Sequence, residues 1–174
     1  NITLEKLNPF DAVVVGIRAF NVEEALAYKN KILWKYVAAG GNLLIQYNTS
    51  RRLKTTELTP LKLNLSRDRV SNEKAELQII NPKHPILNHP NKITSQDFEG
   101  WVQERGLYFP NQWDAQFTPL LQMNDAGESP KKGSLLVAPY GKGRIVYTGL
   151  SFFRQLPAGV PGAYRLFFNL IAKP

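Results

Sequence analysis

A short segment, residues 97–108, holds the most concentrated chemistry of this 174-residue chain. It gathers carboxylates, an indole and a guanidinium group, from Asp97, Glu99, Glu104, Trp101 and Arg105. Paired carboxylates can act as acid and base in glycoside hydrolysis, and the face of an indole suits a sugar ring. The same residues would also form an ion-paired loop in which Trp101 fills the core. Both interpretations stay open, and one of them is a carbohydrate site.

A second segment, residues 149–165, combines turn-forming residues with two arginines. Its glycines and prolines fix the path of the backbone, and Arg154 and Arg165 could present a planar guanidinium fork to a carboxylate or a phosphate. Buried arginines that pair with Asp or Glu would explain the pattern equally well. We keep Arg154 as a candidate ligand-binding residue.

The residue pattern gives little support for nucleophilic catalysis. Ser50 and Ser151 each follow an expected strand, but neither has small residues two places to both sides, as a strained nucleophile elbow requires. The chain has no cysteine, which excludes thiolate catalysis, disulfide bonds and Cys-based zinc sites. We therefore assign no catalytic residue.

Metal-binding and phosphate-binding motifs find no match either. His84 and His89 lie five residues apart in a proline-rich stretch, whereas metal ligands on one helical face are three or four apart. Residues 141–143, Gly-Lys-Gly, join two expected strands, so we interpret them as a tight turn. A phosphate-binding loop would need a helix directly after its glycines. We expect neither a metal nor a cofactor in this domain.

The first third of the chain predicts the elements that would position a ligand site. Residues 11–17 form a continuous apolar, β-branched run that is typical of a buried strand. Asn21 suits a helix N-cap, an apolar stripe at helical spacing continues to Ala39, and residues 42–47 resemble a second buried strand. A strand, a helix and a strand with short connections form a right-handed parallel unit.

This unit places two polar side chains at one edge of the expected sheet. Arg18 and Asn21 follow the first strand directly, and open α/β sheets bind ligands where their strands end. We expect Glu99, Trp101 and Arg105 to join them there, with a sugar ring stacked on the indole.

The rest of the chain is expected to complete a single domain over residues 1–174. Residues 134–138 and 144–149 predict a hairpin, and a helix follows from about residue 163 to residue 172. Residues 48–71 are expected to be mostly loop. Short strands are expected near residues 76–80 and 103–109.

The net charge of +8 raises the question of an anionic partner. Residues 51–74 supply half of this excess, with seven cations against three acids, but the cations are spread along an expected loop with few aromatic residues. A solvated basic face explains this pattern, and a polyanion-binding module is the alternative. We expect no nucleic-acid partner. No apolar run approaches the roughly 20 residues that cross a bilayer.

Three stretches, GIRAFN at 16–21, DFEGWVQERGLYF at 97–109 and GSLLVAPYGKGRIVYTGLSFFRQLPAGVPGAYRLFFNL at 133–170, resemble the C-terminal region of long bacterial PIG-L/LmbE-type deacetylases. In that family the N-terminal domain is a zinc-dependent N-acetyl sugar deacetylase. Its His-Pro-Asp-Asp metal motif is absent here, so no deacetylase role is carried onto any residue of this chain.

The resemblance implies the fold and limits the chemistry. The C-terminal region of the family is similar to class I glutamine amidotransferases, a flavodoxin-like three-layer α/β sandwich with a mainly parallel sheet. Those enzymes place a Cys in a tight elbow after a central strand, where residues 43–47 here run into Asn48, Thr49 and Ser50. The amidotransferase reaction is therefore excluded, and the scaffold remains.

The resemblance also implies a place for this domain in a larger protein. We expect a non-catalytic accessory or ligand-binding domain, with a carbohydrate ligand and the N-terminal deacetylase domain of the same chain as its partners. The chain begins at Asn1 without an initiator Met, from which we expect a fragment of a longer protein. The family resemblance implies an extracytoplasmic, periplasmic location. The alternative in another class is a small carbohydrate-active hydrolase that uses Glu99 and Glu104.

Overall fold

The computed structural model describes residues 2–173 and contains the expected strand–helix–strand unit at its start. A short helix, α1 (Leu4–Leu7), leads into β1 (Ala12–Val15), and α3 (Glu24–Ala38) connects β1 to β2 (Asn42–Ile45). The two strands pair in parallel with Val13 opposite Leu43. The chain turns after α3 at Gly40, whose φ of +122° lies in the region that favours glycine.

A one-turn helix, α2 (Ala19–Val22), lies between β1 and α3 and changes the expected role of Asn21. The prediction of Asn21 as a helix N-cap is wrong, because Asn21 is inside α2 and α3 begins after Glu23. The Asn21 amide instead binds the backbone of residues 49–51.

The main sheet has five strands in the order β1-β2-β9-β8-β6 and is mixed. β9 (Gly143–Thr148) is parallel to β2, but β8 (Leu135–Tyr140) is antiparallel to β9, and β6 (Thr118–Pro119) is antiparallel to β8. The expectation of a mainly parallel, flavodoxin-like three-layer sandwich is therefore wrong. Parallel neighbours need a crossover connection, and the turn between Tyr140 and Gly143 is too short to provide one.

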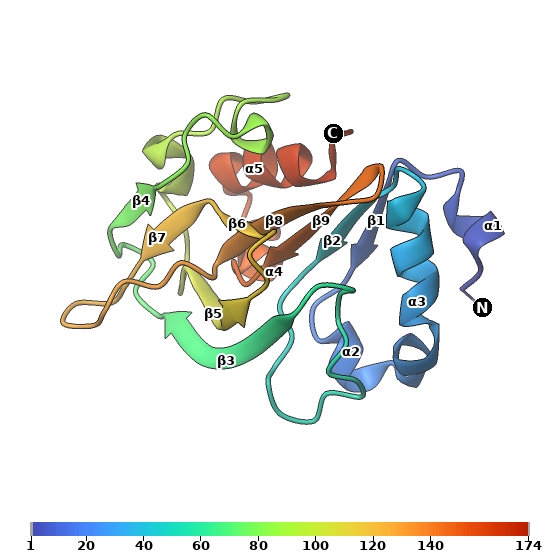
Figure 1. Cartoon of the computed structure of the whole chain (residues 1–174). Helices are drawn as coiled ribbons and strands as arrows, with labels where there is room; N and C mark the ends of the chain where they lie inside the picture. Colours follow the sequence, from blue (N-terminus) through green and yellow to red (C-terminus); the bar gives the residue numbers. More distant parts are fainter. Residues whose placement is uncertain (1, 174) are drawn as a thin grey trace.

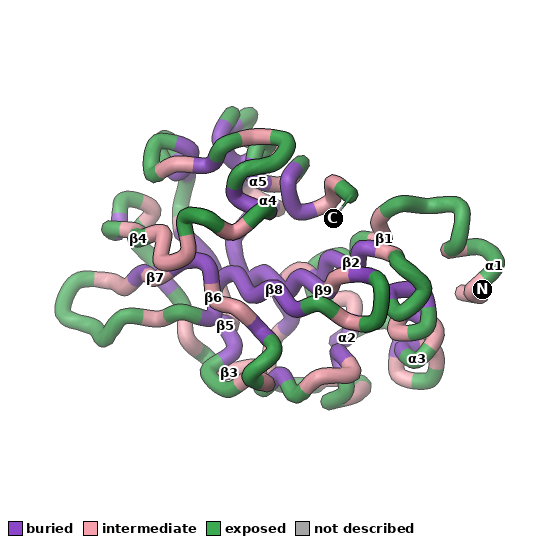
Figure 2. The backbone as a smooth tube through the Cα atoms, turned by 45° about the horizontal axis from the view of Figure 1, so that its top comes forward, coloured by how far each residue is buried: buried purple, intermediate pink, exposed green. Residues whose placement is uncertain are grey.

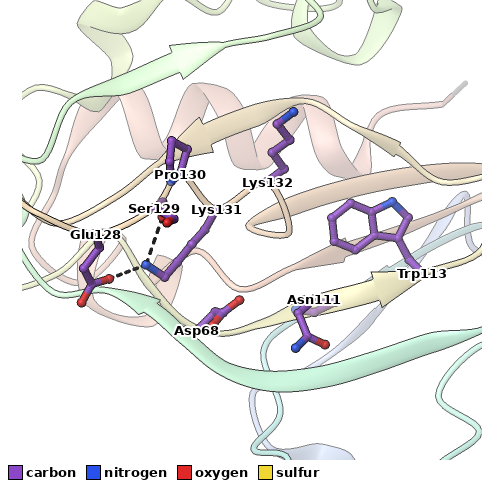
Figure 3. A pocket seen from close by; sticks show the side chains of 9 residues that line it. Asp68, Asn111, Trp113, Glu128, Ser129, Pro130, Lys131 and Lys132 are labelled. Atoms are coloured by element: carbon purple, nitrogen blue, oxygen red, sulfur yellow. Dashed lines mark hydrogen bonds and ion pairs between the residues drawn. The ribbon is translucent and has the colours of Figure 1, made fainter.

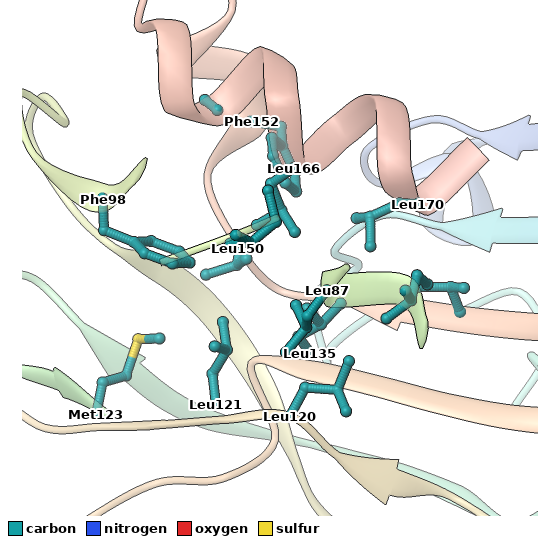
Figure 4. Packing of buried hydrophobic residues seen from close by; sticks show 14 of the residues in the cluster. Leu87, Phe98, Leu120, Leu121, Met123, Leu135, Leu150, Phe152, Leu166 and Leu170 are labelled. Carbon is teal, nitrogen blue, oxygen red and sulfur yellow. The ribbon is translucent and has the colours of Figure 1, made fainter. Parts of the chain in front are cut away.

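The two faces of the sheet are covered by different helices (Figure 1). On β2, Leu43 and Ile45 belong to the core that includes α3, whereas Leu44 belongs to the core that includes α5 (Pro161–Ile171). This alternation follows from the two-residue period of a strand. Figure 4 shows Leu166 and Leu170 of α5 directed toward the buried leucines of the second core.

A second set of strands extends the molecule beyond the main sheet. β3 (Leu63–Val70) and β5 (Gly106–Trp113) form an antiparallel ribbon, and β4 (Leu77–Ile79) pairs with β7 (Leu121–Met123). The expectation that residues 48–71 are mostly loop is wrong for β3. The outer strands are less buried than the central ones (Figure 2), so β3 lacks a strong apolar signal.

Short helices complete the fold around these strands. The two 3-10 helices are η1 (Pro85–Leu87) and η2 (Ser95–Phe98), and one turn of α-helix, α4 (Phe152–Gln155), follows β9. Among residues 2–173, no helix has the length and apolar character required to cross a bilayer.

Candidate functional site

The parallel strands β1, β2 and β9 end at the same edge of the main sheet, and polar or aromatic residues follow each of them. Arg18 follows β1, Tyr47 follows β2, and Arg154 lies in α4 after β9. The Arg18 N–H donates to the Tyr47 carbonyl at 2.8 Å, which ties the first two strand ends together. We call this region the carboxyl edge.

The turn after β2 is closed by its own hydrogen bonds. The buried side chain of Asn48 accepts from the Phe20 N–H and donates to the Gln46 carbonyl, both at 2.9 Å. The Asn21 amide donates to the carbonyls of Thr49 and Arg51 and accepts from the Thr49 N–H. These amides therefore act as structural anchors of the turn after β2.

Three aromatic rings meet beyond this turn. Tyr47 stacks with Tyr108 at 6.2 Å between centroids and an interplanar angle of 10°, and it packs against Phe153 at 5.3 Å. The Arg154 guanidinium lies 4.9 Å from the centroid of the Phe153 ring, in cation–π geometry. Tyr47, Tyr108 and Phe153 form what we call the edge cluster.

A carboxylate reaches the edge cluster because β5 enters alongside the end of β9. The N–H of Leu107 donates to the Gly149 carbonyl, and the N–H of Ser151 donates to the Arg105 carbonyl. A Cβ at Gly149 would collide with the Phe109 ring and the Leu107 carbonyl, so this close approach requires glycine there. Glu104 then accepts from Arg154 Nε at 2.6 Å.

Three charged groups of the carboxyl edge act on the Tyr47 phenol. Burial raises the pKa of the Tyr47 phenol, the charges of Arg18 and Arg154 lower it, and Glu104 raises it. The balance is a raised pKa, so the phenol remains protonated and can donate a hydrogen bond at neutral pH.

Two residues of the carboxyl edge hold unusual backbone conformations. Arg18 has a φ of +55° and Tyr108 has a φ of +51°, values that are uncommon for residues with a Cβ. Such conformations cost free energy and concentrate at ligand sites.

A pocket of about 380 Å³ adjoins the edge cluster through Tyr108. Its other lining residues are Leu107 and the exposed Arg67 and Arg69 of β3. Beside this pocket, the charges of Arg18, Arg154 and Glu104 act on the Tyr47 phenol. The chemistry of the carboxyl edge therefore favours an anionic ligand.

Trp101 and Arg105 lie in the core, away from any open surface. Trp101 is 4% exposed, its Nε1 donates to the Asp97 carbonyl at 3.0 Å, and Phe98 and Phe152 pack on its ring. The Arg105 guanidinium is buried against the Ala75 and Phe98 carbonyls. The buried indole therefore offers no face to a sugar, contrary to the stacking expected from the sequence.

The remaining residues of the 97–108 segment are divided between different surroundings. Glu99 is exposed directly after η2, whereas Asp97 lies within η2 and accepts from the Thr94 N–H and from Arg165 Nε, the latter at 2.7 Å. Glu104 is bound to Arg154. Since Glu99 and Glu104 have such different environments, the structure gives no support to an acid–base pair. Among the six candidate residues, Arg18 and Arg154 are the two that act on Tyr47 together.

Sequence reasoning missed the edge cluster. The sequence predicts only a strand at Tyr47, and it places Tyr108 at the end of a carboxylate-rich segment. The available signal was position: Tyr47 directly follows a buried parallel strand, at the edge where such sheets bind ligands. Nothing local indicated that Tyr108, 61 positions later, would stack on it.

Metal-ion chemistry has no assembled ligand set in the described part of the chain. Residues 2–173 contain no group of three or more His, Asp or Glu side chains placed to hold one ion.

Comparison with known proteins identifies the fold but no family. No protein-family model matches the chain, and no curated protein matches its sequence. The fold is similar to that of the cytoplasmic protein STM3548 from Salmonella typhimurium, with a TM-score of 0.62 and 16% identity over 97% of this chain and 73% of that one. The cytoplasmic protein STM1381 from Salmonella typhimurium LT2 gives 0.61 and 17% over 97% and 74%.

A third similar structure is a β-galactosidase from Rahnella sp. R3, with a TM-score of 0.53 and 14% identity. The likeness covers 96% of this chain but only 23% of that enzyme. At these identities the three likenesses concern the fold alone. Both Salmonella proteins are described as cytoplasmic, which contradicts the extracytoplasmic location expected from the family resemblance, and that expectation is withdrawn.

Proposed function

We propose that this chain is an accessory, ligand-binding domain that lacks amidotransferase chemistry and serves a longer PIG-L/LmbE-like N-acetyl sugar deacetylase. The observation that carries the proposal is the turn after β2. Where an amidotransferase needs a nucleophile, Asn48 is fully buried and its amide is bound to the backbone of Phe20 and Gln46. An amide in that role cannot attack a substrate.

The ligand site of this domain is the carboxyl edge. Arg18 and Arg154 are positioned by the ends of two different strands and converge on Tyr47, and Arg67 and Arg69 line the adjoining pocket. Converging guanidinium groups beside tyrosines suit a ligand with a carboxylate or phosphate group. A carbohydrate that carries such a group fits a deacetylase partner that acts on sugars.

The absence of amidotransferase activity is tested directly by ammonia release from glutamine. We expect the purified chain to give no turnover above the uncatalysed rate. Sustained turnover that is lost in Ser50→Ala would contradict the proposal, because Ser50 is the first serine after β2.

The ligand site is tested by NMR titration of the chain with inorganic phosphate and with D-glucuronate. We expect shifts in the amides of Tyr47, Tyr108 and Arg154, and a loss of affinity of about tenfold in Arg154→Gln. Lys142→Gln is the matched control, because it removes one positive charge in the β8–β9 turn at the opposite edge of the sheet. Equal binding by both variants would exclude the carboxyl edge as the site.

The proposed parent is tested by the coding sequence that precedes Asn1. A His-Pro-Asp-Asp segment there, within an upstream domain, would support the deacetylase. An upstream domain of another catalytic class would contradict it.

A further inference from the structure

We propose that a second site, separate from the carboxyl edge, binds an uncharged pyranose sugar. The site is an open pocket of about 590 Å³ between the β3–β5 ribbon and the loop that joins β7 to β8. We call it the Trp113 groove, and its lining residues used here are Asp68, Asn111, Trp113, Glu128, Lys131 and Lys132. The proposal does not rest on the proposed function, since it concerns other residues and a ligand of different charge.

The ribbon forms the floor of the groove. Arg67 and Arg69 line the pocket next to the edge cluster, whereas Asp68 between them lines the Trp113 groove, as the two-residue period of a strand requires. Figure 3 shows Asp68 and Asn111 standing on the two strands of the ribbon, below the loop that carries Glu128 to Lys132. The two pockets therefore use different residues of the same strand.

Trp113 supplies an aromatic surface that is held in place. It is paired with Leu63 across the ribbon and packs against the core on the α3 side, yet it is only partly buried. An indole that is anchored on one side and open on the other loses little conformational freedom when a ligand stacks on it. The sequence predicts such an open indole face at Trp101, but the structure has it at Trp113.

The loop forms a wall that is fixed at three points. The backbones of Met123 and Lys131 exchange two hydrogen bonds of 3.0 and 2.8 Å, and the Asp125 carboxylate accepts from the N–H groups of Ser71 and Asn72. A Cβ at Gly133 would collide with the Pro110 carbonyl, so the end of the loop lies directly on β5. A groove with fixed walls pays little ordering cost on binding.

The charges of the groove select for an uncharged ligand. Lys131 forms an ion pair with Glu128, and Asp68 and Lys132 contribute one charge of each sign. Asp68 accepts hydrogen bonds, Lys132 donates them, and Asn111 does both, which matches hydroxyl groups that also donate and accept. The apolar face of a pyranose ring is suited to the indole. A sugar without a formal charge satisfies both requirements.

The test is a titration of the whole chain with methyl β-D-glucopyranoside and with N-acetyl-D-glucosamine, followed by amide and indole NMR shifts. We expect saturable shifts at Asn111, Trp113 and Lys132, with a Kd of the order of millimolar. Trp113→Ala should weaken binding about tenfold, and Asp68→Asn, which keeps the size of the side chain, should weaken it about fivefold. Tyr28→Ala is the matched control, because it removes an aromatic ring that is 84% exposed on α3.

Two further arms separate the alternatives. Arg154→Gln should leave sugar binding at the Trp113 groove unchanged. The result at the groove is therefore independent of whether the carboxyl edge binds an anionic ligand. Absence of shifts up to about 50 mM sugar, or binding that Trp113→Ala and Asp68→Asn both retain, would overturn the proposal. The same titration is made with D-glucuronate and with adenosine. Tighter binding of D-glucuronate than of the neutral sugars at these residues would overturn the proposal. Binding of adenosine without binding of either neutral sugar would also overturn it.

Discussion

At the scale of single residues, Asn48 stabilises the turn that follows β2. Its side chain is fully buried, accepts from Phe20 N–H and donates to the Gln46 carbonyl, while its own N–H donates to the Tyr147 hydroxyl. Removal of the amide would leave the buried Phe20 N–H and the partly buried Gln46 carbonyl without these partners. Such groups are costly because water cannot replace the lost hydrogen bonds.

We therefore expect Asn48→Ala to lower the free energy of unfolding by about 1–3 kcal/mol. Ser50→Ala, on the partly exposed end of the same turn, serves as the control and should change it by less than about 0.5 kcal/mol. Urea unfolding followed by circular dichroism measures both. Equal effects would show that the Asn48 hydrogen bonds contribute nothing specific.

His84 makes the stability of the η1 region depend on pH. Its Nδ1 accepts from the Ile86 N–H at 3.2 Å, which requires an unprotonated nitrogen. Burial lowers the pKa of His84, and the charge of Arg144 lowers it further. In the unfolded chain its pKa returns to about 6.5, so the unfolded state binds the proton more tightly.

The neutral His84 therefore stabilises the fold fully above about pH 6.5, and this contribution falls as the pH drops through the lower pKa of the folded state. His84→Asn keeps a side-chain acceptor for the Ile86 N–H but cannot be protonated. Unfolding measured from about pH 8 to pH 5 should show a smaller loss of stability in this variant. The same pH dependence in both proteins would rule out His84 as its source.

At the scale of elements, the basic segment is divided between a loop and a strand. The loop before β3 contains Arg51, Arg52 and Lys54, and Lys54 forms an ion pair with Glu24. The ribbon contains Arg67 and Arg69. The cations of residues 51–74 thus belong to different elements.

We expect the chain to elute from heparin at about 150 mM salt, because salt at this concentration screens the weak attraction between exposed charges and heparin. A variant with Arg51, Arg52 and Lys54 all changed to Ala should elute only slightly earlier. Retention far above this concentration that the triple variant abolishes would favour a polyanion-binding module instead.

The elements that the sequence predicts are those with a local signal. The β-branched run of β1, the apolar stripe of α3 and the glycine turn between β8 and β9 indicate their structures without knowledge of distant residues. β3 carries only Leu63 and Val70 as fully buried apolar residues, and its partner β5 lies more than 30 residues later with shifts in register. The site depends on such distant pairings, so Arg18 and Arg154 could be named from the sequence but the cluster around Tyr47 could not.

At the scale of the whole molecule, Trp101 joins η2, α4 and the core beneath α5. Its ring packs against Phe98 and Phe152, and the Arg105 guanidinium lies 5.9 Å from its centroid. We expect Trp101→Ala to lower the free energy of unfolding by about 3–5 kcal/mol, because it leaves a large cavity. Trp113→Ala, at a partly exposed ring, should cost less than half as much. A near-neutral Trp101→Ala would mean that this ring is not part of the core.

The position of β2 in the sheet has a consequence for synthesis of the chain. β2 leaves the ribosome early, but its neighbour β9 and the covering helix α5 are made about one hundred residues later, which takes roughly 5–20 s. During that interval the N-terminal strands have an unpaired edge and one bare face, with Leu44 exposed. The core can therefore be completed only after the last part of the domain has been synthesised. A nascent chain stalled before β9 would expose an unpaired, aggregation-prone strand edge to chaperones and proteases.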